Sequence, residues 1–458
     1  MKINQPFVPI IGTLFNERVF GPDPYSTILA MSPPCARGKS TAFHGHMESL
    51  LESKPGARVL LLSANILYGT SLTADLRKKY KDHDGTRVGF YREGHEMDEF
   101  NVIVCSLESL HHLDGQRFDA ILIDELRTIA RLVGGATMMD FNNIYLMHEL
   151  ALKAADVVVC DADLMFKIDS SETNTLAYDF MKLLFGDRPV LHASLSHPGP
   201  DHLKRSVKLL LDHGSKKKNP GKKHWFNELE KAVAAWHANR SKRFAACVGS
   251  KTQLREVYKF LIEHKVPVKA YSGDTNEAAK FEDLQDADSA WIEFGCVAAT
   301  TSLSIGVDPK EVEFDRVFMW THPQGCMLLA MFQAAMRFGR QAAHPLGNKV
   351  VCMLVKCIPP GERAKQVRLG KKKPIVNPTY EAEYQRLVKR RGAAARMAAR
   401  EIVASGGRSI GVDAPRTVAD QILRVMAHGA LERKVQVVNH YRAVARCIQH
   451  YGWIIESE

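Results

Sequence analysis

Short apolar runs recur along this chain, and each is separated from the next by a helical pattern. In the first part the runs are rich in Leu, Ile and Val and only six to eight residues long. Apolar runs of this length between helices are typical of a parallel sheet that is buried on both faces. The predicted strands are 27–32, 57–64, 101–106, 118–125 and 157–163. The sequence therefore predicts an α/β domain over residues 1–195.

The same rhythm returns after a break. Residues 196–225 contain Pro, Gly and a lysine run, which are typical of a linker. Helical patterns at 226–239, 252–263 and 326–337 then alternate with new apolar runs. The predicted strands of this part are 243–250, 266–273, 296–301, 316–321 and 349–356. We expect a second α/β domain over 226–360 and a mostly helical, basic region over 361–458.

The composition excludes several classes of protein. Of the 458 residues, 45% are hydrophobic and 25% are charged, as in globular domains rather than disordered chains. No run approaches the roughly 20 apolar residues of a membrane span, and the N-terminal residues lack the pattern of a signal peptide. The nine cysteines form no C-x-x-C pair, so no disulfide framework or structural zinc site is expected. We expect a cytoplasmic protein that is not secreted and has no membrane partner.

The positive charge is concentrated near the C-terminus. The net charge is +11, and residues 361–400 hold twelve lysines and arginines against three acids. Such a cluster suits a polyanion such as nucleic acid, because cations neutralise phosphates and release counterions. A solvated surface explains the same charges equally well. We take Lys371, Lys372 and Lys373 as candidate nucleic-acid contacts.

A phosphate-binding loop is predicted between the first strand and the first helix. The backbone N–H groups of such a loop cradle phosphates, its lysine reaches the β- and γ-phosphates, and its hydroxyl ligates Mg²⁺. Here the lysine is Lys39 and the Mg²⁺ ligand is Ser40, flanked by the nucleotide-binding candidates Gly38 and Thr41. Pro33 stands where the usual pattern has its first glycine, so the entry to the loop must differ.

Two adjacent carboxylates, Asp124 and Glu125, end the apolar run at 118–125. In nucleotide hydrolases such an Asp holds Mg²⁺, usually through water, and the Glu polarises the attacking water. A GTPase or a metabolite kinase fits these features as well. Neither of those classes explains a second α/β domain.

A third motif lies in the second half. Gln333, Arg337 and Arg340 come at the end of a predicted helix. The two arginines share one helical face and suit a γ-phosphate as arginine fingers. Upstream, a hydroxyl-rich turn after a predicted strand contains Gly306 and Asp308.

The order of these motifs resembles that of the superfamily 2 helicases, which are two-lobed, nucleic-acid-dependent ATPases. The resemblance covers about residues 25–360. It implies two tandem RecA-like lobes with ATP and Mg²⁺ bound between them. The implied catalytic residues are Lys39, Asp124, Glu125, Gln333, Arg337 and Arg340. Gly306 and Asp308 are implied to contribute to nucleotide binding. The implied contacts to nucleic-acid phosphates are Ser63, Ser106, Ser109, Ser250 and Thr300.

Within that superfamily, the stretches 105–111 and 160–164 resemble the origin-binding-protein helicases of herpesviruses and phages. This resemblance implies a helicase or translocase that acts on DNA rather than RNA, in replication or recombination of a virus, phage or mobile element. Its partners would be replication or recombination proteins, in a host cytoplasm or nucleus. Branch-migration motors without strand separation are an adjacent alternative.

A rival hypothesis is a nucleic-acid-binding protein with a vestigial ATPase. Pro33 favours it, whereas the retention of Lys39, Asp124 and Glu125 opposes it. Because the basic region 361–458 lies outside both predicted lobes, we expect its removal to weaken nucleic-acid binding and to spare basal ATPase activity.

Overall fold

The chain divides into two compact units in the computed structural model. The first comprises Met1–His197 with Thr379–Leu431, and the second comprises Pro198–Pro378 with Glu432–Glu458. Within them, the residues that the structure describes are 28–32, 39–64, 66–81, 86–93, 97–133, 142–167, 172, 174–186, 188–194, 206–212, 220–303, 309, 311–324, 327–338, 350–356, 379–405, 414–438, 440–451 and 453–455.

The first unit is built on a seven-stranded parallel sheet with the order β3-β4-β2-β5-β6-β1-β7. Its strands are β1 (Ile28–Ser32), β2 (Val59–Ser63), β3 (Val88–Phe90), β4 (Val102–Ser106), β5 (Ala120–Asp124), β6 (Asp156–Cys160) and β7 (Val190–Ser194). Nearly all residues of β1 to β6 are buried, which explains their continuous apolar runs. β6 separates β5 from β1, so the phosphate-loop strand and the carboxylate strand are next-nearest neighbours.

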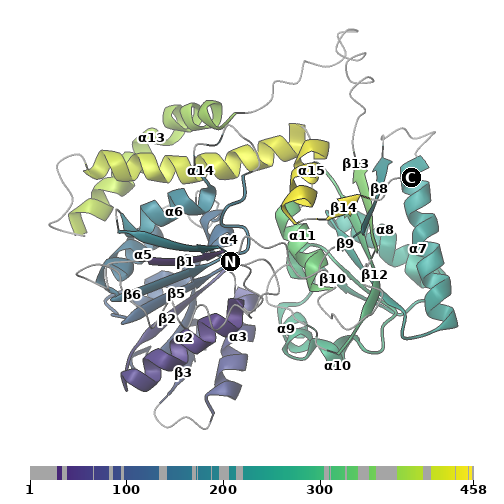
Figure 1. The fold of residues 1–458 in the computed structure, drawn as a ribbon, viewed down its shortest axis with the longest axis horizontal. Coiled ribbons are helices and arrows are strands. Elements are labelled where there is room, and N and C mark those ends of the chain that lie inside the picture. The colour runs from purple at the N-terminus through teal and green to yellow at the C-terminus, as the bar shows by residue number, and fades with distance from the viewer. Residues whose placement is uncertain are drawn as a thin grey trace, which may run out of the picture. The chain divides into compact units, whose positions relative to one another are not determined.

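Helices cover both faces of this sheet (Figure 1). α2 (Lys39–Ser53) and α3 (Ile66–Lys79) lie on one face, and α5 (Asn142–Lys153) and α6 (Leu176–Phe185) lie on the other. The short helix α4 (Leu126–Ala130) follows β5 directly. Because every strand is parallel, all carboxyl ends meet at one edge of the sheet, where open α/β sheets bind their ligands.

The C-terminal helices α13 (Tyr380–Ser405) and α14 (Ala414–Val438) contribute to the first unit up to Leu431. α13 packs against α5, and Figure 1 shows α14 running beside α13 and α6. Buried apolar residues such as Leu387 and Ile422 explain this packing. Residues 379–431 are therefore part of a lobe, whereas the sequence placed them outside both lobes.

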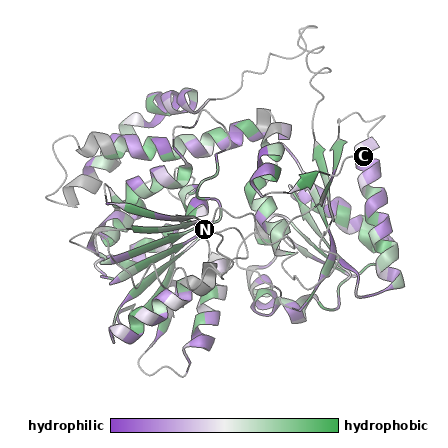
Figure 2. Cartoon of the chain, viewed as in Figure 1, coloured by the Kyte–Doolittle hydropathy of each residue, from purple (hydrophilic) through white to green (hydrophobic). Residues whose placement is uncertain are grey.

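The second unit contains another seven-stranded parallel sheet, with the order β10-β11-β9-β12-β13-β8-β14. Its strands are β8 (Ser206–Asp212), β9 (Arg243–Val248), β10 (Val268–Tyr271), β11 (Cys296–Ala299), β12 (Phe314–Thr321), β13 (Val350–Lys356) and β14 (Ile454–Ile455). Its helices are α7 (Pro220–Ala238), α8 (Lys251–Glu263), α9 (Glu277–Gln285), α10 (Ala287–Trp291), α11 (Leu328–Arg337) and α15 (His440–His450). In both units the strands are largely hydrophobic, whereas the helices mix hydrophobic and hydrophilic residues (Figure 2).

The predicted linker 196–225 contains ordered elements of the second unit. β8 pairs with β13 along its whole length, and α7 begins at Pro220 rather than at 226. Proline at a helix start is favourable because its missing N–H would have no partner there. β8 was not predicted from the sequence, because Pro, Gly and Lys residues surround its short apolar run.

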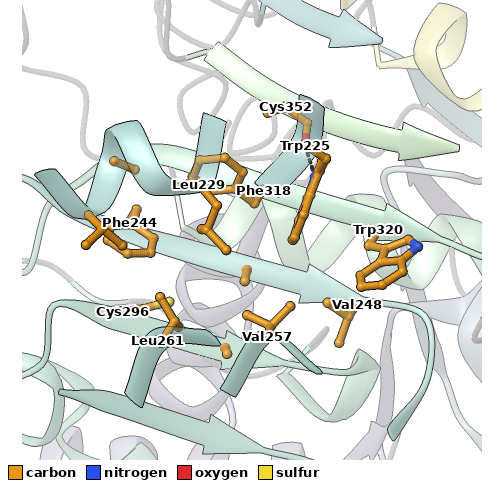
Figure 3. Close-up of a cluster of buried hydrophobic side chains, with 14 of the residues drawn as sticks. Trp225, Leu229, Phe244, Val248, Val257, Leu261, Cys296, Phe318, Trp320 and Cys352 are labelled. Atoms are coloured by element: carbon orange, nitrogen blue, oxygen red, sulfur yellow. Dashed lines mark hydrogen bonds between the residues drawn. The ribbon is translucent and has the colours of Figure 1, made fainter. Parts of the chain in front are cut away.

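An aromatic cluster packs α7 and α8 onto one face of the second sheet (Figure 3). The ring of Trp225 lies 5.6 Å from that of Phe318 and 5.5 Å from that of Trp320. Its indole N–H donates a 3.2 Å hydrogen bond to the carbonyl of Cys352. Burial of these rings anchors the helices that flank the strand ends.

The two parallel sheets and the helical C-terminal region confirm the predicted fold class. Within the described parts of the chain, no helix has the length and apolar character required to cross a membrane.

Candidate active site

The strand and helix of the predicted phosphate loop are in place. β1 ends at Ser32 and α2 begins at Lys39, so six residues of sequence separate the end of the strand from a helix N-terminus. That arrangement is the one a phosphate-binding loop requires. The backbone of Lys39, Ser40 and Thr41 forms the first turn of α2, but their side chains and Gly38 lie outside the described residues. Their roles stay predictions.

Asp124 and Glu125 lie at the carboxyl end of β5 and are 8% and 5% exposed. Two donors orient Asp124. The hydroxyl of Tyr68, on α3, donates to its Oδ2 at 2.5 Å, and the N–H of Glu125 donates to its Oδ1 at 3.0 Å. α2 is also close, since the charge of Asp124 acts on His44 of that helix. The pKa of His44 is lowered, mainly by burial and also by Lys79, and the negative charge of Asp124 works in the opposite direction.

Glu125 has a left-handed backbone, with φ 57° and ψ 48°. This conformation costs a non-glycine residue on the order of 1 kcal/mol or more and is concentrated at functional sites. It forms the junction between β5 and α4, so the direction of the Glu125 side chain depends on how α4 is held.

The carboxylate of Asp124 suits Mg²⁺. It is an oxygen ligand at the edge of the sheet where β1 also ends, and two neighbours already fix its orientation. No other grouping favours a metal, because the described residues contain no set of three His, Cys, Asp or Glu side chains arranged to hold an ion.

Asp161 connects the three central strand ends. Its N–H donates to the carbonyl of Met31 on β1 at 3.1 Å. Its Oδ2 accepts from the N–H of Arg127 and its Oδ1 from the N–H of Asp163, both at 2.7 Å. The segment after β6 is thereby tied to the end of β1 and to α4, the helix that follows β5.

Arg127 is buried beneath this connection and is 1% exposed. Its Nη1 donates to the carbonyl of Phe166 at 2.8 Å, and its guanidinium lies 5.1 Å from the centre of the Phe166 ring. Burial lowers its pKa to about 10, so Arg127 remains charged at neutral pH. The burial of this arginine could not be predicted from the sequence, because its spacing carries no sign of it.

The predicted phosphate contacts of the first unit differ in exposure. Ser63 and Ser106 end β2 and β4 and are buried, and the hydroxyl of Ser63 donates to the carbonyl of Cys105 at 3.3 Å. Ser109 lies on the 3₁₀ helix after β4 and is half-buried. Of these three side chains, Ser109 offers the most surface to a ligand.

In the second unit, Ser250 and Thr300 also follow strand ends. Ser250 caps α8 by accepting a 3.2 Å hydrogen bond from the N–H of Gln253, and Thr300 is buried after β11. Gln333 is buried on α11, and Arg337 is the last residue of that helix. The side chain of Arg337 lies outside the described residues, as do Gly306, Asp308, Arg340 and Lys371–Lys373 in full.

C-terminal residues support α11. The ring of Phe332 stacks on Trp453 with 4.7 Å between centroids. The N–H of Leu328 donates to Oε1 of Gln436 at 3.2 Å, which satisfies a group at the helix N-terminus. The sequence did not predict these contacts, because the partners are more than 100 residues apart.

Comparison with solved structures identifies the fold. The helicase MrfA bound to DNA superposes with a TM-score of 0.56 at 14% identity, covering 86% of this chain and 54% of that one. The fold is that of two tandem RecA-like lobes, as in this helicase. The Mycobacterium smegmatis helicase Lhr, bound to ssDNA and AMP-PNP, has a TM-score of 0.50 at 16% identity, covering 86% and 51%. S. cerevisiae Dbp5 bound to Gle1 has a TM-score of 0.50 at 13% identity, covering 76% and 83%.

The chain thus spans about half the length of MrfA and of Lhr. No protein-family model and no curated protein matches the sequence. The predicted superfamily resemblance agrees with this helicase fold.

Proposed function

We propose that the protein is an ATP-dependent nucleic-acid helicase or translocase. The observation that carries the proposal is the buried pair Asp124 and Glu125, oriented at the ligand-binding edge of a helicase-fold sheet. Helicase neighbours that were solved with DNA, and with AMP-PNP in the case of Lhr, support it.

In this proposal the chain's own residues divide the work of hydrolysis. Lys39 and the loop before α2 bind the phosphates, and Glu125 polarises the attacking water. Ser40 and Asp124 would hold Mg²⁺, which when bound neutralises charge on the phosphates. In the second lobe, Arg337 and Arg340 would act with Gln333 on the γ-phosphate, the two arginines as arginine fingers. Gly306 and Asp308 would contribute to nucleotide binding.

Nucleic-acid binding is proposed to rest on phosphate contacts. On α13, Lys389, Arg390, Arg396 and Arg400 are exposed, so this helix presents positive charge to solvent. Contacts of this kind give affinity without sequence choice.

The finer proposal is DNA rather than RNA as the substrate, with a role in replication or recombination of a virus, phage or mobile element. It rests on the local resemblance of residues 105–111 and 160–164 to origin-binding-protein helicases. Preference for DNA, and for one duplex sequence over others, would support it.

Steady-state ATP hydrolysis tests the proposed function. The purified protein is assayed alone and with single-stranded, duplex, forked and four-way DNA and with RNA. We expect turnover that nucleic acid stimulates, and loss of that turnover in the folded Lys39→Ala variant. Absence of turnover with every nucleic acid, or full turnover in Lys39→Ala, would overturn the proposal.

A further inference from the structure

Three buried ionisable side chains meet in the first unit, on segments far apart in the sequence. Nδ1 of His428, on α14, lies 2.6 Å from Oε2 of Glu172, and its Nε2 lies 3.0 Å from Oδ2 of Asp179, on α6. The three side chains are 0%, 0% and 5% exposed. Since both ring nitrogens face carboxylates, the arrangement fits an imidazolium that donates two hydrogen bonds.

Neighbouring side chains hold this cluster of His428, Glu172 and Asp179 in place. Nδ2 of Asn174 donates to Oδ1 of Asp179 at 2.8 Å. The ring of Tyr380, on α13, lies 4.7 Å from the ring of His428. The cluster therefore joins both C-terminal helices to α6.

Such a cluster is a costly way to attach a helix. Buried charges must be paired and hydrogen-bonded to be tolerated, and apolar side chains of similar volume often hold elements together as well or better. The advantage of the charged cluster is direction, because two hydrogen bonds from one ring fix the positions of two acceptors. What it fixes is α6 and the segment before it.

α6 in turn packs against α4, the helix that follows Glu125. Arg127 of α4 is buried in the same region, where Glu172 attracts its charge. Glu125, with its left-handed backbone, forms the junction between β5 and α4. A displacement of α4 would therefore turn the carboxylate that polarises the attacking water.

We propose that His428 is a positioning residue for the ATPase: through Asp179 and Glu172 it holds α6, and through α6 it holds α4 and the carboxylate of Glu125. The inference rests on the proposed ATPase activity. It assigns to the C-terminal helix α14 a direct influence on the rate of hydrolysis, without any contact to the nucleotide.

The test compares His428→Gln with wild type and with His224→Gln, which replaces an exposed histidine of α7. We expect kcat for ATP hydrolysis to fall by roughly tenfold in His428→Gln, as for other residues that orient catalytic groups, while the Kd for a fluorescent ATP analogue stays within about threefold. A purely structural role would lower the melting temperature but leave kcat at 20 °C unchanged. Unchanged kcat in folded His428→Gln would overturn the proposal.

A second variant covers the case in which His428→Gln does not fold. Glu172→Gln keeps the shape of the side chain and the bond between His428 and Asp179, and we expect it to lower kcat in the same direction by a smaller factor. Wild-type kcat in Glu172→Gln would then overturn the proposal.

Hydrogen–deuterium exchange separates this inference from the proposed function. We expect faster exchange over 125–131 in the variants, whether or not the protein hydrolyses ATP. If wild type has no ATPase activity but this exchange increases, the proposed function fails and the structural coupling stands. If the exchange over 125–131 is unchanged, the coupling itself is wrong.

Discussion

The hydroxyl of Tyr68 donates a 2.5 Å hydrogen bond to Oδ2 of Asp124, although 56 positions separate the two residues. Tyr68 lies on α3 and Asp124 ends β5, so the bond links the helix after one central strand to the end of its neighbour. It fixes the orientation of the carboxylate that we assign to Mg²⁺. Mutation of a residue that orients a metal ligand typically lowers metal affinity or activity by about 10- to 100-fold.

Tyr68→Phe removes this donor and keeps the ring. We expect the Mg²⁺ concentration for half-maximal ATP hydrolysis to rise by roughly tenfold, as for other outer-sphere partners of metal ligands. A magnesium titration of ATPase activity measures it, with Tyr178→Phe, an exposed tyrosine of α6, as the control. The same Mg²⁺ dependence in both variants would show that Tyr68 does not orient Asp124.

We predict that the cluster of His428, Glu172 and Asp179 makes the folding stability of the protein depend on pH. Burial by itself lowers the pKa of His428, but hydrogen bonds to Asp179 and Glu172 outweigh it and raise the pKa above 6.5. The ring of Tyr380 also faces His428, and burial, the main cause, raises the pKa of that phenol, so it stays neutral. A histidine with a raised folded pKa contributes its full stability below the unfolded pKa, and the contribution is lost as pH rises through the folded pKa.

Melting temperatures of wild type and His428→Gln between pH 5.5 and 9 test this dependence. We expect the stability advantage of wild type to be largest at the acidic end and to shrink as the pH rises. An advantage that is constant across the range would mean that His428 does not carry a proton that matters for folding.

We predict that Trp453, near the end of the described residues, stabilises the second unit. Trp453 is 5% exposed and stacks on Phe332 of α11. Trp453→Ala should cost roughly 3 kcal/mol of unfolding free energy, as large-to-small changes in a core do. Denaturant unfolding measures it, and Ile454→Ala, at an exposed position, should cost less than about 0.5 kcal/mol. Equal costs for the two variants would contradict the packing.

The fold could largely be predicted from the sequence, because apolar runs between helices have few other solutions. The run predicted at 243–250 is β9 (Arg243–Val248), and the one at 349–356 is β13 (Val350–Lys356). β3 was missed because three residues give no pattern. The place of α14 was missed because its partners, Glu172 and Asp179, lie about 250 positions away.

The candidate site was predictable only in part. Asp124 and Glu125 were found because two carboxylates after an apolar run form a local signal. The left-handed backbone of Glu125, the hydrogen bond from Tyr68 to Asp124 and the burial of Arg127 depend on tertiary contacts, which spacing does not encode. The positive charge of residues 361–400 led to the prediction of a nucleic-acid contact. Because of that charge, the buried face of α13 was not predicted.

The lysines at 371–373 remain candidate nucleic-acid contacts. Replacing all three with Gln should flatten the slope of log K against log salt by about 2 on single strands, since each phosphate contact contributes about 0.7. Lys242, Lys259 and Lys265 are exposed lysines of the second unit and, replaced together, serve as the control. An equal change of slope in both triple variants would indicate general charge effects rather than a contact at 371–373.

Truncation of 361–458 is not a suitable test of the basic region. It would remove α13 and α14 from the first unit and expose Glu172 and Asp179 without their partner. We therefore expect the truncated chain to lose stability and ATPase activity together, contrary to the expectation from sequence.

ATP hydrolysis by Glu125→Gln tests the central claim most directly. The substitution keeps the size of the side chain and removes the carboxylate that we propose polarises the attacking water. We predict that the variant binds ATP and nucleic acid within about threefold of wild type, whereas its nucleic-acid-stimulated kcat falls by roughly 10²-fold or more. A kcat equal to that of wild type in the folded variant would contradict the account.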